Sequence, residues 1–139
     1  MDEVTRIVLS DALAGAIRAA ARAAYPFEAC GLLIGRIMGS ACVIERVAAS
    51  ANVAAGDKRR EFEIDPKLQF MLMRELRGTD RDIVGVYHSH PNGAAAPSAT
   101  DAARAFDRGF IWIIAGGAEI AAYIALGDVQ RFRRLEIVS

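Results

Sequence analysis

The apolar run of residues 83–87 leads directly into the only two histidines of the chain, His88 and His90. Such a run predicts a buried strand, and alternate residues of a strand project from the same face. The two imidazoles are therefore expected side by side at the strand end, before a turn at Pro91 and Gly93. Functional side chains cluster at strand ends of this kind. We expect both histidines to be metal ligands rather than structural residues.

The remaining sequence alternates predicted strands with predicted helices. The expected strands cover residues 5–9, 30–37, 42–47, 62–64, 83–87, 110–115, 120–125 and 129–137. Helices are expected between Ser10 and Tyr25, between Asp65 and Gly78, and from Ser98 to Asp107, each with a capping residue at its start. The run 30–37 lacks polar alternation, as in strands covered on both faces. These patterns predict one α/β (α+β) domain over residues 1–139, a mixed sheet packed with about three helices.

Composition restricts the function. The 139 residues are 53% hydrophobic with a mean hydropathy of +0.22, which suffices for a real core. Seventeen basic and seventeen acidic residues cancel, which argues against a nucleic-acid partner. No signal peptide or membrane-spanning run is visible, so we expect a cytoplasmic protein that binds no membrane. Arginines at 131, 133 and 134 predict a solvated edge strand.

The two cysteines, Cys30 and Cys42, do not resemble a secreted disulfide framework. Free thiols are expected, although a bridge between them across neighbouring strands stays open. A Cys30 nucleophile paired with His88 or His90 is a rival hypothesis. It is disfavoured because a thiol inside an apolar strand is normally inert and because one imidazole would have no role.

Ser98 and Asp101 have two interpretations. The spacing is that of a capping box, in which Ser98 caps a helix and Asp101 reaches back to the Ser98 amide. A carboxylate near a helix N-terminus also stays ionised, as a zinc ligand must. With His88 and His90 it would leave a fourth position for water, which is the composition of a catalytic zinc site.

A zinc hydrolase also needs a base to accept a proton from the water. Glu28 is a candidate because it precedes the apolar run 30–37, although the local sequence favours a solvated residue there. Glu61, Glu63 and Asp65 are competitors that local chemistry does not exclude.

The stretch from His88 to Asp101 resembles the JAMM motif of the JAB/MPN metalloproteases. The likeness lies in its His-Ser-His start, the spacing of its serine and aspartate, and its prolines at 91 and 97. Residues 25–35 resemble the segment that carries this family's glutamate, and residues 62–66 resemble the lead into its second helix. The resemblance covers nearly the whole chain.

This resemblance implies a mechanism. His88, His90 and Asp101 would bind zinc, Glu28 would act as general acid and base through the zinc-bound water, and Ser98 would hydrogen-bond the developing oxyanion. Active members cut an isopeptide or peptide bond after the C-terminal glycines of ubiquitin or a ubiquitin-like protein. Short prokaryotic members act on ubiquitin-like or sulfur-carrier modifiers, and some release a C-terminal cysteine. All five motif positions are filled, which disfavours an inactive, scaffold-type member.

Several expectations concern partners. We expect a diglycine tail to pair with the strand at residues 62–64 by β-addition, with the loop 52–60 bordering the groove. Two alternative functions stay open: a zinc-stabilised module that binds a modifier without cutting it, and a DNA-repair-associated JAMM-type protein. The sequence is also compatible with a homodimer.

Overall fold

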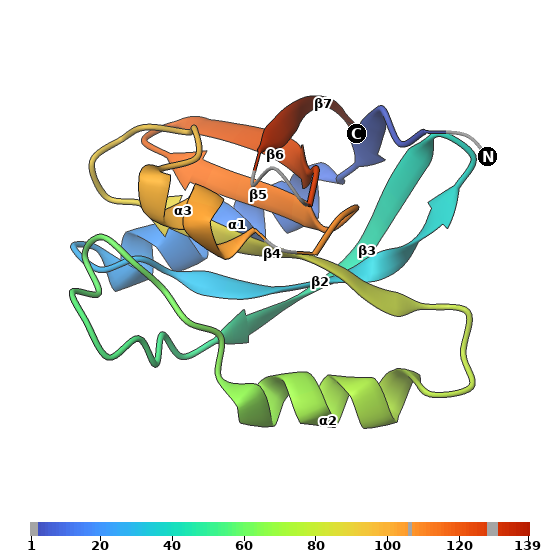
Figure 1. Ribbon diagram of the computed structural model, residues 1–139, viewed down its shortest axis with the longest axis horizontal. Coiled ribbons are helices and arrows are strands. Elements are labelled where there is room, and N and C mark those ends of the chain that lie inside the picture. Colours follow the sequence, from blue (N-terminus) through green and yellow to red (C-terminus); the bar gives the residue numbers. More distant parts are fainter. Residues whose placement is uncertain (1–2, 106, 128–130) are drawn as a thin grey trace.

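The computed structural model describes residues 3–105, 107–127 and 131–139 (Figure 1). Its elements are, in chain order, β1 (Arg6–Val8), α1 (Asp11–Ala24), β2 (Cys30–Met38), β3 (Ala41–Ser50), α2 (Pro66–Leu76), β4 (Asp82–His90), α3 (Ala99–Arg104), β5 (Ile111–Gly116), β6 (Glu119–Ala125) and β7 (Phe132–Val138). Strands form a closed barrel in the order β1-β3-β2-β4-β5-β6-β7. The α+β fold with a mixed sheet and three helices is therefore confirmed for the described residues.

Strand β1 closes the barrel because it pairs in parallel with both β3 and β7. Strand β7 pairs with β6 over residues 132–135 and with β1 over residues 136–138, so β7 as a whole is not an edge strand, contrary to the prediction. Arg133 and Arg134 lie in its first half, which pairs with β6 alone. There Arg133 lies 3.3 Å from a carboxylate oxygen of Glu3, and Arg134 lies 3.5 Å from one of Glu119.

The strands predicted at residues 30–37 and 42–47 are present and form a hairpin around Gly39. Strands β2 and β3 pair antiparallel over their length, with an irregularity after Ile34. Gly39 adopts a φ of +62°, a conformation that side chains with a Cβ rarely take. Residues 30–35 are all buried, as their unbroken apolar character predicts. This places the first residues of β2 beside the end of β4, where Cys30 is opposite His88.

The strand predicted at residues 62–64 is wrong. Only Ile64 forms a single bridge, to Asn52. The neighbouring backbone groups are bound elsewhere: the Glu63 amide donates to the Asn52 side chain, and the Phe62 carbonyl accepts from Arg104. Helix α2 begins at Pro66 with Asp65 as its cap, as predicted.

Some predicted boundaries differ from the structure or fall outside it. Helix α3 ends at Arg104 rather than at residue 107, and Phe106 lies outside the described residues. Asp128 and Val129, expected in a turn and at the start of the last strand, also lie outside them. Strand β7 begins at Phe132.

Alternate residues of β4 face two different environments. Tyr87 belongs to the core cluster that includes Ile17 of α1, whereas Val86 packs with Phe62 and Trp112. His88 and His90 lie on the Val86 face, the side on which α3 packs (Figure 1). In the part of the chain that the structure describes, no helix is both long enough and apolar enough for a bilayer crossing.

Candidate metal centre

The two histidines at the end of β4 direct the same ring nitrogen to one point. Their Nε2 atoms lie 3.0 Å apart, and both side chains are buried, His88 completely. The parallel neighbour β5 reaches as far as this strand end, with Ile114 opposite His88 and Gly116 opposite His90. The side-by-side arrangement predicted from the i, i+2 spacing is present.

Helix α3 supplies the carboxylate. Oδ2 of Asp101 lies 3.2 Å from Nε2 of His88 and 3.0 Å from Nε2 of His90. In a tetrahedral zinc site with bonds of 2.0–2.1 Å, neighbouring ligand atoms would be about 3.3–3.4 Å apart. The three predicted ligand atoms therefore form a triangle slightly smaller than such a site requires. Two imidazole nitrogens and one carboxylate oxygen are a donor set that fits a divalent metal ion.

The capping box at the start of α3 is also present. Oγ of Ser98 accepts a hydrogen bond from the Asp101 amide at 3.1 Å, and the Ser98 amide donates to Oδ2 of Asp101 at 2.9 Å. The two interpretations of this motif are compatible, because the cap holds the same oxygen that faces the histidines. The local turn thus aims the carboxylate before any metal is considered.

The electrostatics favour the metal-ligating state of Asp101 and His88 but not that of His90. Burial tends to raise the pKa of Asp101, but hydrogen bonds from His88 and His90 outweigh it and hold the pKa well below the usual range. Burial lowers the pKa of His88. Burial also acts to lower the pKa of His90, but there the hydrogen bond and charge of Asp101 prevail and raise it. An ionised carboxylate and a neutral His88 are the forms that ligate metals.

Glu28 lies next to this triad and is only 3% exposed, so the expectation of a solvated residue is wrong. Glu28 and the two histidines offer ligand atoms that lie within 4.8 Å of one another. Burial raises the pKa of Glu28 to about 7, and its Oε1 is buried without a hydrogen-bond partner in the described chain. A carboxyl group with that pKa can both accept and return a proton near neutrality.

The three other carboxylates considered as the base, those of Glu61, Glu63 and Asp65, have other contacts or positions. Asp65 caps α2, and Glu61 lies 3.6 Å from a guanidinium nitrogen of Arg104. Glu63 lines a groove beyond the triad. Among the acidic side chains considered from the sequence, Glu28 is the one that the fold buries beside the histidines.

The backbone around Glu28 is held by two residues whose roles sequence reasoning missed. Ser89 Oγ accepts from the Ala29 amide at 2.8 Å, and Asn52 donates to the Glu28 carbonyl at 3.1 Å. Ser89 could have been suspected from its place between the histidines. Asn52 carries no local signal, because its partners are distant in sequence.

The thiols are not part of this chemistry. Cys30 and Cys42 are both free and buried, so the disulfide left open is absent from the described residues. Burial raises the pKa of each to about 11. A thiol with that pKa stays protonated near neutrality, which argues against the rival Cys–His pair.

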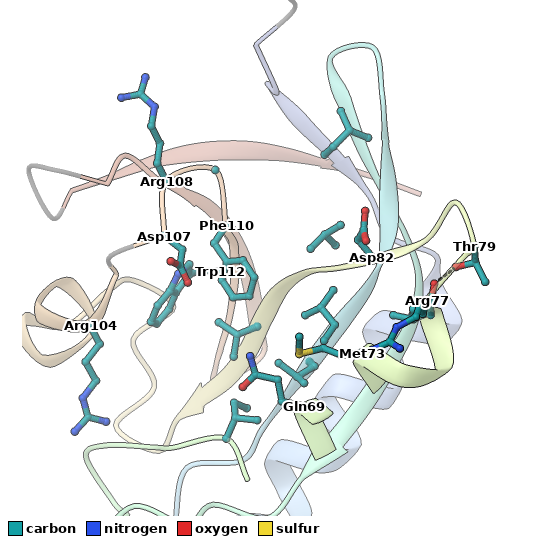
Figure 2. Close-up of a pocket in the computed structure, with 18 of the residues that line it drawn as sticks. Gln69, Met73, Arg77, Thr79, Asp82, Arg104, Asp107, Arg108, Phe110 and Trp112 are labelled. Atoms are coloured by element: carbon teal, nitrogen blue, oxygen red, sulfur yellow. Dashed lines mark hydrogen bonds between the residues drawn. The ribbon is translucent and has the colours of Figure 1, made fainter. Parts of the chain in front are cut away.

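A groove of about 1120 Å³ lies between α2 and the segment that joins α3 to β5, next to the centre but not lined by Glu28, the histidines or Asp101. Figure 2 shows Gln69 and Met73 on its α2 side, facing Arg104 and Trp112. Phe62 also lines the groove and stacks on His88 with ring centroids 4.4 Å apart. The Phe62 ring therefore lies between the groove and His88, one of the three predicted ligands.

Comparisons with known proteins agree with this geometry. A family model described as prokaryotic homologs of the JAB domain matches residues 10–135. The chain is 33% identical over 117 residues to a desampylase of Haloferax volcanii, covering 81% of this chain and 78% of the relative.

Solved structures are similar as well. A protein of Desulfitobacterium hafniense shares 32% identity at a TM-score of 0.81, with 95% of this chain and 91% of that chain covered. A Salinibacter ruber protein shares 30% identity at a TM-score of 0.69, with 96% and 90% covered. A JAB1/MPN domain protein of Archaeoglobus fulgidus, at 19% identity and a TM-score of 0.58 over 97% and 98%, shows the same fold.

Proposed function

Because the chain belongs to the family of prokaryotic JAB-domain proteins, we propose that it is a zinc metallopeptidase that acts on a small modifier protein. The bond cleaved would follow the C-terminal glycines of a ubiquitin-like or sulfur-carrier protein. The carrying observation is the convergence of His88, His90 and Asp101 on one point, with a buried Glu28 beside it. The relative named desampylase supports a deconjugating activity.

The proposed metal ligands are Nε2 of His88, Nε2 of His90 and Oδ2 of Asp101. Zinc, when bound, would polarise water and a carbonyl group and lower the pKa of that water to about 7. The chain's part is to hold three ligands rigidly and to leave one side of the triad for water and substrate. His90 is fixed by its Nδ1, which lies 2.7 Å from the Ala94 carbonyl.

Glu28 is the proposed proton carrier. Its carboxylate and the two histidine nitrogens lie within 4.8 Å of one another, so water bound at the metal position would be within reach of Glu28. Its carboxylate would take a proton from that water and deliver it to the amine that leaves. Burial raises its pKa to about 7 in the metal-free chain, and a bound cation would lower it toward the ionised form that accepts the proton.

Ser98 is proposed to stabilise the negative charge that develops on the substrate carbonyl. Its Oγ accepts from the Asp101 amide, which leaves the hydroxyl proton available to a second partner. Because the capping box fixes this side chain, the donor is in place before the substrate arrives.

The groove of Figure 2 is the proposed path of the modifier's tail. The sequence predicts that the tail adds as a strand beside residues 62–64. The bonds of Glu63 to Asn52 and Val53 lie on the inner edge of this segment, and on its outer edge the Phe62 carbonyl is already taken by Arg104, which disfavours strand addition at that position. A tail is instead proposed to lie between α2 and Trp112, held mainly by side chains.

The test combines zinc quantification with cleavage of fusions that carry a modifier with a diglycine end. Wild type should bind one zinc per chain and cleave, whereas Glu28→Gln should bind zinc and lose about 10²–10⁴-fold in kcat. No zinc at stoichiometry would refute the proposal. Zinc at stoichiometry and binding of the modifier without cleavage by wild type would favour the non-cleaving binding module instead, and normal cleavage by Glu28→Gln with zinc bound would remove Glu28 from the mechanism.

A further inference from the structure

The two histidines are oriented in different ways. His90 has a carbonyl partner for its second ring nitrogen, at 2.7 Å. His88 has none: its Nδ1 is buried without a hydrogen-bond partner in the described chain. Metal-bound histidines usually donate this second N–H to a carboxylate, a carbonyl or water, and that bond sets the orientation of the ring. Within the described chain, packing is therefore what orients the His88 ring.

Two aromatic rings enclose the His88 imidazole. The Phe62 ring stacks on it with centroids 4.4 Å apart and an interplanar angle of 21°. The Trp112 ring meets it edge to face at 5.7 Å and 88°. Phe62 and Trp112 also contact each other, at 5.9 Å and 71°. The imidazole plane is thus fixed by ring packing from two directions.

The position of Phe62 is itself held by its backbone. Asn52 donates to the Glu61 carbonyl at 3.0 Å and accepts from the Glu63 amide at 3.1 Å. Arg104 of α3 donates to the Phe62 carbonyl at 2.6 Å. Groups on both sides of Phe62 are therefore bonded, although the segment belongs to no strand. These bonds fix the backbone from which the Phe62 ring projects onto His88.

We infer that Phe62 is a positioning residue for His88, whose ring replaces the hydrogen bond that Nδ1 lacks and keeps Nε2 aimed at the metal position. The face of an aromatic ring is electron-rich, and an imidazole becomes more positive when its other nitrogen binds a cation. The stack therefore strengthens when the metal binds. This inference rests on the proposed metal site but does not depend on the substrate.

The experiment measures zinc affinity by competition with a chelator. Phe62→Leu removes the ring, Phe62→Tyr keeps it, and Phe70→Leu is the matched control because Phe70 is exposed on α2. Phe62→Leu should weaken zinc binding by about 10–100-fold, the usual loss when a residue that orients a ligand is removed. Phe62→Tyr and the control should bind like wild type. The visible spectrum of the cobalt-substituted protein should change in Phe62→Leu alone.

A purely structural Phe62 would lower the stability of the metal-free protein but leave zinc affinity and the cobalt spectrum unchanged, and that result overturns the inference. If Phe62→Leu does not fold, Arg104→Gln serves as the second variant. This substitution removes the guanidinium that donates to the Phe62 carbonyl. Weaker zinc binding in that variant supports the inference, and wild-type affinity overturns it. A wild-type protein that binds no zinc removes the proposed function as well, so the two failures are distinguishable.

Discussion

The Ser89 hydroxyl accepts a hydrogen bond from the Ala29 amide at 2.8 Å, and the Ser89 amide donates to the Ala29 carbonyl at 3.0 Å. These two bonds join the residue between the histidines to the residue after Glu28. The distance between the proposed base and the proposed ligands is therefore set by direct contact between the β4 end and the start of β2.

Ser89→Ala should lower both stability and activity. The variant leaves the buried Ala29 amide without its side-chain partner, which costs about 1–3 kcal/mol. Urea unfolding of the chelator-treated protein measures that loss, and cleavage assays should show a lower kcat because Glu28 is less well placed. Ser89→Thr keeps a hydroxyl and serves as control. Wild-type stability in Ser89→Ala would show that this bond is unimportant.

Asp101→Asn should separate the two roles of Asp101. An amide oxygen can still accept from the Ser98 amide, so α3 should keep its start, but the negative charge is lost. Zinc affinity should fall by about tenfold or more, because zinc prefers the ionised ligand. Chelator competition measures the affinity, and far-UV circular dichroism checks the fold. Undiminished zinc binding would remove Asp101 from the ligand set.

Ser98→Ala should lower stability and activity but not zinc affinity, in contrast to Asp101→Asn. Removing the cap costs about 0.5–2 kcal/mol in unfolding free energy, while zinc affinity stays close to wild type. The kcat for cleavage should fall by about 10²–10³-fold if the hydroxyl supports the developing charge. A kcat that falls only in proportion to the unfolded fraction would leave Ser98 with the capping role alone.

The metal-free protein should lose stability with rising pH because of Glu28. Burial raises its pKa from 4.5 to about 7, so the folded chain holds this proton more tightly than the unfolded chain. The contribution is fully present below pH 4.5 and is lost as the pH rises through about 7. Urea midpoints of chelated wild type should therefore fall relative to Glu28→Gln between pH 5 and pH 8. Parallel midpoints would contradict the raised pKa.

The groove can be tested on one helix with a matched pair. Met73 lines it and is 53% exposed, whereas Met71 is 57% exposed but does not line it. Met73→Asp should raise KM for a modifier fusion several-fold with zinc affinity unchanged, because the charge disrupts an apolar wall. Met71→Asp should behave like wild type. Equal effects of the two substitutions would place the tail elsewhere.

Both thiols should be slow to react in the native state. With a pKa of about 11, about one thiol in a thousand is ionised at pH 8, against about one in ten for an ordinary thiol. Alkylation should therefore be slow until denaturant is added, and Cys30→Ala should retain cleavage. Loss of activity after rapid alkylation of Cys30 in the native protein would reopen the nucleophile hypothesis.

Local patterns predicted the features that depend on neighbouring residues. The apolar runs marked β2, β4 and β5, and the i, i+2 spacing placed His88 and His90 on one face. The Asp65-Pro66 start of α2 was equally direct, because capping is a property of a few consecutive residues.

Features that depend on distant pairing were missed. Closure of the barrel rests on the short strand β1, whose parallel partners begin at Ala41 and Glu136. Glu28 is buried where Ser89 binds the Ala29 amide and Asn52 binds the Glu28 carbonyl, and no local pattern encodes these contacts between distant residues. The incorrect prediction of a strand at residues 62–64 has the same cause, since the backbone of this segment is bound by the side chains of Asn52 and Arg104.

Phe62 belongs to the groove wall and to the stack on His88 at once. Binding free energies around a closed cycle must sum to zero, so two ligands that share one side chain influence each other reciprocally. A tail that steadies this ring would raise zinc affinity by the same factor by which zinc raises the affinity for the tail. The zinc affinity measured without a tail would then be lower than the zinc affinity of the tail-bound protein. When zinc is scarce, molecules without a bound tail would lose their metal first.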